Sequence, residues 1–172
     1  MNDVRIEKTN GGLGRRNPSG DMISGLLANG VAVSGGAQLD ITYRLAGVQD
    51  AIAIGLDAEY DETNSVLVYE HINEYFRNNS DGDLRIMLVA QTVSYADMLD
   101  KSNEYAKKLL REEGGDIKQL GVAFNPSTPV IDFSNALAAI AKAQELYTEE
   151  YSQHRPVEII LEGAGLDVTD PD

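Results

Sequence analysis

Cysteine is absent from the 172-residue sequence. A chain without cysteine cannot form a disulfide framework or a thiolate nucleophile, and it cannot bind zinc or an iron–sulfur cluster through sulfur. The absence also fits folding in a reducing compartment. These classes of site are therefore excluded from the start.

Positive charge is scarce as well. The sequence has 14 lysine and arginine residues against 28 aspartate and glutamate residues, so its formal net charge is −14. Binding to a nucleic-acid backbone needs a basic face, and no basic patch interrupts this acidic composition. We expect no nucleic-acid partner.

Long apolar runs are missing too. Nowhere do about 18 uncharged apolar residues follow one another, which is the length that a membrane-spanning helix needs. The N-terminus, Met1–Arg5, has no apolar signal-peptide core. We expect a soluble protein, made in the cytosol, with no membrane partner. Its length fits one domain with a substantial core.

The first 36 residues differ in composition from the rest, because glycine recurs between Asn10 and Gly36. Ordering glycine is entropically expensive, so the composition predicts a flexible N-terminal arm over residues 1–36. The run Gly11–Gly14 lacks the lysine–serine or lysine–threonine pair of a phosphate-binding loop, and Pro18 follows it in place of a helix.

A short alternating segment lies inside this arm. Val4 and Ile6 fall on one side of an extended chain, and Arg5 and Glu7 fall on the other. The period of two is typical of a β-strand. It has no obvious local partner.

Strands and helices alternate through the rest of the chain. Alternation over Leu39–Leu45 predicts a half-buried strand that either joins the main sheet or leaves it. Further strands are predicted at 84–90, 117–124 and 157–161, with helices between them. This βαβ rhythm predicts an α/β fold, a three-layer domain with a mainly parallel sheet flanked by helices, over residues 37–165. We expect residues 166–172 to form a C-terminal tail.

The three predicted helices have recognisable ends. Asn64 or Ser65 can cap the first, and Ser94 can cap the second with Asp97 at its third position, before Gly114-Gly115 stops it. The third runs from about residue 132 to 153. We expect its buried face to hold Phe133, Leu137, Ile140, Ala141, Gln144, Tyr147 and Tyr151.

Polar side chains follow the predicted strands, where ligands bind in open α/β sheets. They are Gln91, Thr92, Asn125, Ser127 and Glu162. None is a histidine or cysteine, so they supply no nucleophile–base pair. The alternative, which we prefer, is that they satisfy loop backbone.

The two histidines stand apart from these strand ends and from each other. His71 lies within a predicted helix without a second histidine at a metal-binding offset, and His154 follows a helix end. We therefore expect no catalytic residue, no cofactor-binding residue and no metal ligand, and the protein is not expected to be an enzyme.

The order of segments in the middle of the chain is familiar. Val48–Ala51 leads to Gly55, a helix ends at Tyr75–Arg77, and the strand Leu84–Val89 follows. The continuation consists of Ala96–Asp100, Asn103–Leu110 and Gln119–Ala123. Over residues 39 to 168 this arrangement resembles the contractile-tail sheath proteins of bacteriophages, in a prophage-borne branch.

The resemblance implies a structural subunit that stacks in helical rows around a tail tube and rearranges when the tail contracts. Its partners would be other sheath subunits and the tail tube protein, and its location the virion tail, assembled in the bacterial host cytoplasm. Sheath subunits add strands from terminal arms to their neighbours' sheets. Here Val4, Arg5, Ile6 and Glu7 are the candidates for subunit interaction. Sheath proteins are usually longer, so we expect a short or truncated member.

Two other functions remain open from the residues alone. The polar strand ends suit an α/β enzyme that binds a small molecule, although no histidine or cysteine lies near them. The −14 surface suits an adaptor that binds a basic partner.

Overall fold

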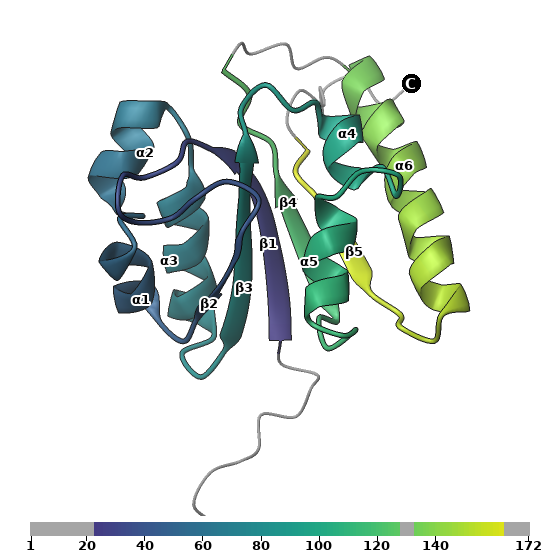
Figure 1. The fold of residues 1–172 in the computed structure, drawn as a ribbon, viewed down its shortest axis with the longest axis horizontal. Helices are drawn as coiled ribbons and strands as arrows, with labels where there is room; N and C mark the ends of the chain where they lie inside the picture. Colours follow the sequence, from purple (N-terminus) through teal and green to yellow (C-terminus); the bar gives the residue numbers. More distant parts are fainter. Residues whose placement is uncertain (1–22, 128–132, 164–172) are drawn as a thin grey trace, which may run out of the picture.

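A computed structural model describes residues 23–127 and 133–163 (Figure 1). The segment Val4–Glu7 and the tail at 166–172 lie outside the described residues. Within them, five strands form one sheet of order β2-β3-β1-β4-β5. The strands are β1 Ile23–Gly30, β2 Thr42–Leu45, β3 Asp83–Ala90, β4 Gln119–Ala123 and β5 Glu158–Leu161.

Six helices of the described chain flank this sheet. They are α1 Val48–Ala53, α2 Ala58–Asn64, α3 Val68–Asn78, α4 Tyr95–Leu99, α5 Ala106–Glu112 and α6 Phe133–Ser152. Figure 1 shows α1, α2 and α3 on one face and α4, α5 and α6 on the other. All strand pairs are parallel except β2 with β3. The predicted three-layer α/β domain with a mainly parallel sheet is confirmed.

Alternation along the strands divides the core in two. In β1, Leu27 faces α4 and α5, whereas Leu26 and Ala28 face the α1–α3 side. In β3, Met87 and Val89 belong to the first cluster, and Leu84, Ile86 and Leu88 belong to the second. Both faces of the central strands are therefore covered, which explains their nearly continuous apolar sequence.

The prediction of a single arm over residues 1–36 is wrong for residues 23–36. Six of the eight residues of β1 are buried, and β1 is the central strand, paired with both β3 and β4. A Cβ on Gly25 would lie 3.0 Å from Leu120 and 3.2 Å from Ile117, so side chains from the neighbouring segment fill the space. Pairing and packing on both sides outweigh the entropic cost of ordering this glycine.

Strand predictions nearer the C-terminus are confirmed with small changes of boundary. β3 begins one residue earlier than predicted, and β4 and β5 are shorter than predicted. The segment predicted at Leu39–Leu45 does join the sheet, as the antiparallel edge strand β2, with an isolated bridge between Leu39 and Leu88.

The start of the first predicted helix is wrong. Asn64 ends the unpredicted helix α2, and Ser65 has φ 54° in the left-handed region at its end. The next helix, α3, has no side-chain cap from Leu67. The carboxylate of Asp61 instead accepts the N–H groups of Tyr69 and Glu70 at 3.0 Å each, which satisfies donors in the first turn of α3.

The second predicted helix is two helices. Ser94 caps α4 as predicted, accepting the N–H of Asp97 at 3.1 Å. The helix then stops at Asp100, whose carboxylate accepts the N–H of Ser102 at 2.8 Å in a turn that competes with helix propagation. Gly114 and Gly115, with φ 62° and 92°, follow α5 as predicted.

Helix α6 confirms the predicted extent and corrects the predicted face. The face toward the core consists of Ala136, Ala139, Ala143 and Leu146, and it packs mainly against α4. The predicted residues Leu137, Ile140, Ala141, Gln144, Tyr147 and Tyr151 are exposed, and the Phe133 side chain lies outside the described residues. The reason is steric, since α4 contributes Tyr95, Met98 and Leu99 and a small-residue face fits closely against them.

Candidate functional site

The carboxyl end of β1 is the topological switch point of the sheet, because the connections on its two sides run over opposite faces. Asn29 is fully buried there. Its Nδ2 donates to the carbonyl of Ala90 at 3.0 Å, and its Oδ1 accepts the N–H of Asn125 at 3.1 Å. One amide thus ties together the ends of β1, β3 and β4.

Tyr60, from α2, bonds to the backbone of the residue that follows β1. Its hydroxyl accepts the N–H of Val31 at 2.8 Å and donates to the Val31 carbonyl at 2.9 Å. Burial raises the pKa of the Tyr60 phenol. Gly30 makes room for this hydroxyl, because a Cβ at that position would lie 2.5 Å from it. The polar side-chain atoms of Asn29 and Tyr60 at this switch point are therefore bonded to the chain's own backbone.

The polar residues predicted at the strand ends are largely bonded to loop backbone. The Nε2 of Gln91 donates to the carbonyls of Asn64 and Asn125, at 3.1 and 3.3 Å. A carboxylate oxygen of Glu162 accepts the N–H of Phe124 at 2.9 Å. For Gln91 and Glu162 the preferred alternative, satisfaction of loop backbone, is thus confirmed.

Asn125 and Ser127 lie beside Gln91, and the Nδ2 of Asn125 is buried with no hydrogen-bond partner among the described residues. Ser127 donates its N–H to the Gln91 carbonyl at 3.3 Å, and Thr92 is exposed. Sequence reasoning missed Asn29 and Tyr60. An asparagine within the apolar run of β1 is a detectable signal, but it fell inside the segment interpreted as an arm.

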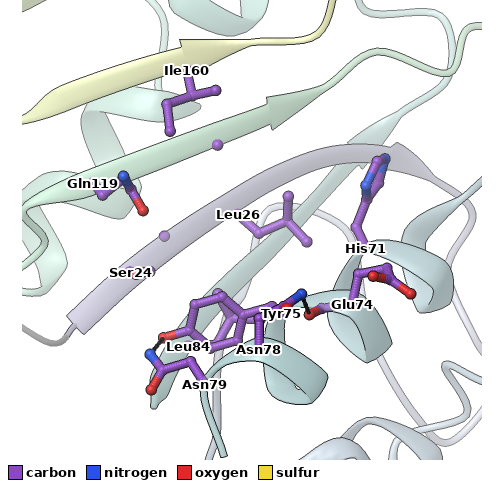
Figure 2. Close-up of a pocket in the computed structure, with 12 residues that line it drawn as sticks. Ser24, Leu26, His71, Glu74, Tyr75, Asn78, Asn79, Leu84, Gln119 and Ile160 are labelled. Atoms are coloured by element: carbon purple, nitrogen blue, oxygen red, sulfur yellow. Dashed lines mark hydrogen bonds between the residues drawn. The ribbon is translucent and has the colours of Figure 1, made fainter.

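A hollow of about 590 Å³ lies beside α3, on the sheet face where β4 and β5 carry no helix (Figure 2). Its floor contains Gly25 and Gly121, and its rim contains Glu74 and Tyr75 from α3. Among the described residues, no lysine or arginine lines it.

His71 lies at this hollow, and its Nε2 is buried without a hydrogen-bond partner among the described residues. The hollow contains no second histidine. In the part of the chain that the structure describes, no group of three or more histidine, aspartate or glutamate residues could hold a metal ion. His154 lies just after α6, with φ 60°.

The opposite end of the sheet carries an ion-pair cluster that the sequence did not predict. Arg85 is almost fully buried, and it pairs with Asp83 and, through Nε at 2.6 Å, with Glu113. Arg44 reaches the second oxygen of Asp83 at 2.7 Å. Burial lowers the pKa of Arg85, but the hydrogen bonds to both carboxylates outweigh it and raise the pKa overall.

The outer surfaces are the remaining candidate sites. Among the described residues, β2 and β5 each pair with one neighbour only, so each presents an open edge. None of the helices in residues 23–127 and 133–163 is long and apolar enough to cross a membrane. The candidates for interaction therefore lie on the sheet edges and on α6.

A family model described as DUF2586, N-terminal domain, matches residues 1–171. The match takes in almost the whole chain. No curated protein matches it.

Proposed function

We propose that this chain, which belongs to the family described as DUF2586, N-terminal domain, is a structural subunit of a phage-type contractile tail sheath. It polymerises around a tail tube and rearranges on contraction. Its partners are further copies of itself and the tail tube protein, and it resides in the virion tail. The order and spacing of segments over residues 39 to 168 are the sequence support for this proposal.

The observation that carries the proposal is the pair of open edges on the sheet. The outer sides of β2 and β5 present N–H and C=O groups without strand partners in the described chain. Such edges accept an added strand. The segment Val4–Glu7 of another copy has the period of two that strand addition requires.

The condition of the switch point favours a structural role over a catalytic one. Three polar side chains there, those of Asn29, Tyr60 and Gln91, form hydrogen bonds with the chain's own backbone. A binding crevice usually keeps a few polar groups available to its ligand. Here these three side chains are bonded internally, whereas the open sheet edges suit assembly.

A single added strand binds weakly. Each main-chain hydrogen bond contributes only about 0.5–1.5 kcal/mol. Many arms within a closed ring benefit from a high effective concentration, so association strengthens steeply once several copies are engaged. Assembly should therefore depend strongly on protein concentration and on the tail tube.

The test is negative-stain electron microscopy of the purified protein, alone and with the tail tube protein, joined to analytical ultracentrifugation. We expect rings or tubes, which weaken when residues 1–20 are deleted or when Val4 and Ile6 are both changed to proline. Proline cannot donate a ladder hydrogen bond. The matched control is Val4→Ile with Ile6→Val, which keeps the pattern. Unchanged association in the proline variant would refute the arm, and monomers at every concentration with the tube protein present would refute the sheath function.

A further inference from the structure

Helix α6 carries a second apolar stripe on its outer side. Leu137, Ile140, Tyr147 and Tyr151 are 49%, 39%, 45% and 62% exposed, although each is large and apolar. With the exposed Gln144 they follow spacings of three and four residues. Those are the a and d positions of a helix that packs along a partner helix. We call these five residues the α6 seam.

None of the five seam residues is charged. The charged side chains of α6 lie at other positions of the helix, and each forms an ion pair within the chain. Lys142 pairs with Asp100 at 3.0 Å, and Glu149 pairs with Lys107 at 2.7 Å. The other two pairs are Glu145 with Lys142 at 3.7 Å and Glu150 with Arg155 at 2.9 Å. All four acidic and basic side chains of α6 are thus satisfied within the chain.

This distribution bears on what can cover the seam. Two copies of a chain with net charge −14 repel each other over most of their surfaces. None of the seam residues is charged, so seam against seam brings no like charges together, and the carboxylate in the hollow beside the seam is that of the exposed Glu158. The exposed Ala141 and Thr148 extend the uncharged surface beside the seam.

The seam is also complementary to itself. Leu137 and Tyr151 lie seven residues on either side of Gln144. In an antiparallel pair centred on Gln144, Leu137 meets Tyr151 of the second copy, and Ile140 meets Tyr147. The two Gln144 amides face each other and can exchange hydrogen bonds, as single polar residues do in fixing the register of helix pairs.

A neighbouring hollow extends the apolar surface toward the sheet. Ile140, Gln144 and Tyr147 share a cavity of about 450 Å³ with residues of the C-terminal strand region, Val157, Glu158, Ile159 and Leu161. The rings of Tyr147 and Tyr151 stack with their centroids 5.9 Å apart, so the apolar surface continues from the hollow along the seam. A second helix that rests on the seam covers part of this hollow as well.

We infer that α6 is a self-docking helix, on which the α6 of a second copy packs antiparallel through the seam. Stable interfaces bury about 800 Å² on each partner, and five seam positions on one helix fall below that area. The dimer is therefore weak and forms in the micromolar range or above. This contact involves none of residues 1–22, and its failure would leave the sheath proposal standing.

Sedimentation velocity over a range of protein concentrations tests the inference on the full chain. Ile140→Glu with Tyr147→Glu should raise the dimer dissociation constant about tenfold or more, because it places carboxylates in the seam of both copies. The matched control is Leu67→Glu, an equally exposed leucine outside α6, which should leave the dimer intact. Equal urea midpoints would show that both variants are folded.

Disulfide trapping tests the orientation, and the absence of cysteine makes it clean. Gln144→Cys alone should cross-link to a dimer on mild oxidation, and Leu137→Cys alone should not. Mixing Leu137→Cys with Tyr151→Cys should yield the mixed dimer. Efficient cross-linking of Leu137→Cys alone would overturn the antiparallel arrangement. A protein that stays monomeric, or a dimer that survives the glutamate variant, would overturn the inference itself.

Discussion

Gly30→Ala is expected to destabilise the protein through one atom, the hydroxyl oxygen of Tyr60. The added Cβ would lie 2.5 Å from that oxygen, whereas its next contacts, with Leu88 methyl carbons, are 3.3 and 3.5 Å. Gly30 has strand geometry without a positive φ, so backbone strain does not contribute. Overpacking of this kind lowers the free energy of unfolding by about 1–3 kcal/mol.

Removing the hydroxyl should rescue the substitution. Tyr60→Phe alone deprives Val31 of two hydrogen bonds, which lowers the free energy of unfolding by about 1–3 kcal/mol. In that background the Cβ of Gly30→Ala has no oxygen to meet. Alanine in a strand is favoured over glycine by about 0.5–1 kcal/mol, so the second substitution should be neutral or stabilising.

The assay is urea denaturation of the four proteins of this double-mutant cycle, followed by circular dichroism. We expect the double variant to be at least as stable as Tyr60→Phe. Gly121→Ala is the matched control, because a Cβ there meets nothing closer than 3.8 Å and should be tolerated in both backgrounds. Additive losses from Gly30→Ala and Tyr60→Phe would refute the reasoning.

Three further predictions concern the buried side chains of Arg85 and Asn29 and the ion pair of Asp100. Arg85→Met should lower the free energy of unfolding by about 3–5 kcal/mol in urea denaturation, because it leaves the buried Asp83 carboxylate short of a cation, and adding Asp83→Asn should recover part of the loss. Asn29→Ala should lower it by about 1–3 kcal/mol for each backbone group left unpaired, by the same assay. The N–H of Ser102, and then the ammonium of Lys142, hold the pKa of Asp100 below its ordinary value. The stabilising effect of Asp100 is therefore present above its unfolded pKa and is lost as pH falls through the lower folded pKa. NMR titration should show that pKa rising in Lys142→Gln.

The sequence carried enough information for the layers of the fold and for the C-terminal half of the sheet. The apolar run at Leu84–Ala90 and the cap at Ser94 are local signals, and both correspond to the structure. Strand β1 was missed because its apolar residues are mixed with glycines. Whether a strand can include a glycine such as Gly25 depends on the side chains that pack against it, and here one of them, Leu120, lies far along the chain. Information of that kind is not local.

The correction in α6 has a similar cause. The helix is apolar on two faces, and period alone cannot say which one meets the core. The choice depends on the bulk of Met98 and Leu99 opposite, which selects the alanine face. The candidate site was harder to predict, since Asn29 acquires its role only when three strand ends converge.

The position of β1 also determines how the domain would carry a mechanical load. A pull applied at Ile23 enters the sheet at its central strand, which is registered by eight residue pairs to β3 and five to β4. Parallel strands pulled along their axis share the load among all these pairs in shear, so many hydrogen bonds must yield together. The same force on β5, held by four pairs on one side only, meets far less resistance. Ile23 is thus the stronger attachment point. With the second handle at the same position in both experiments, optical-tweezer unfolding should require a larger force when the first handle is on β1 than when it is on β5.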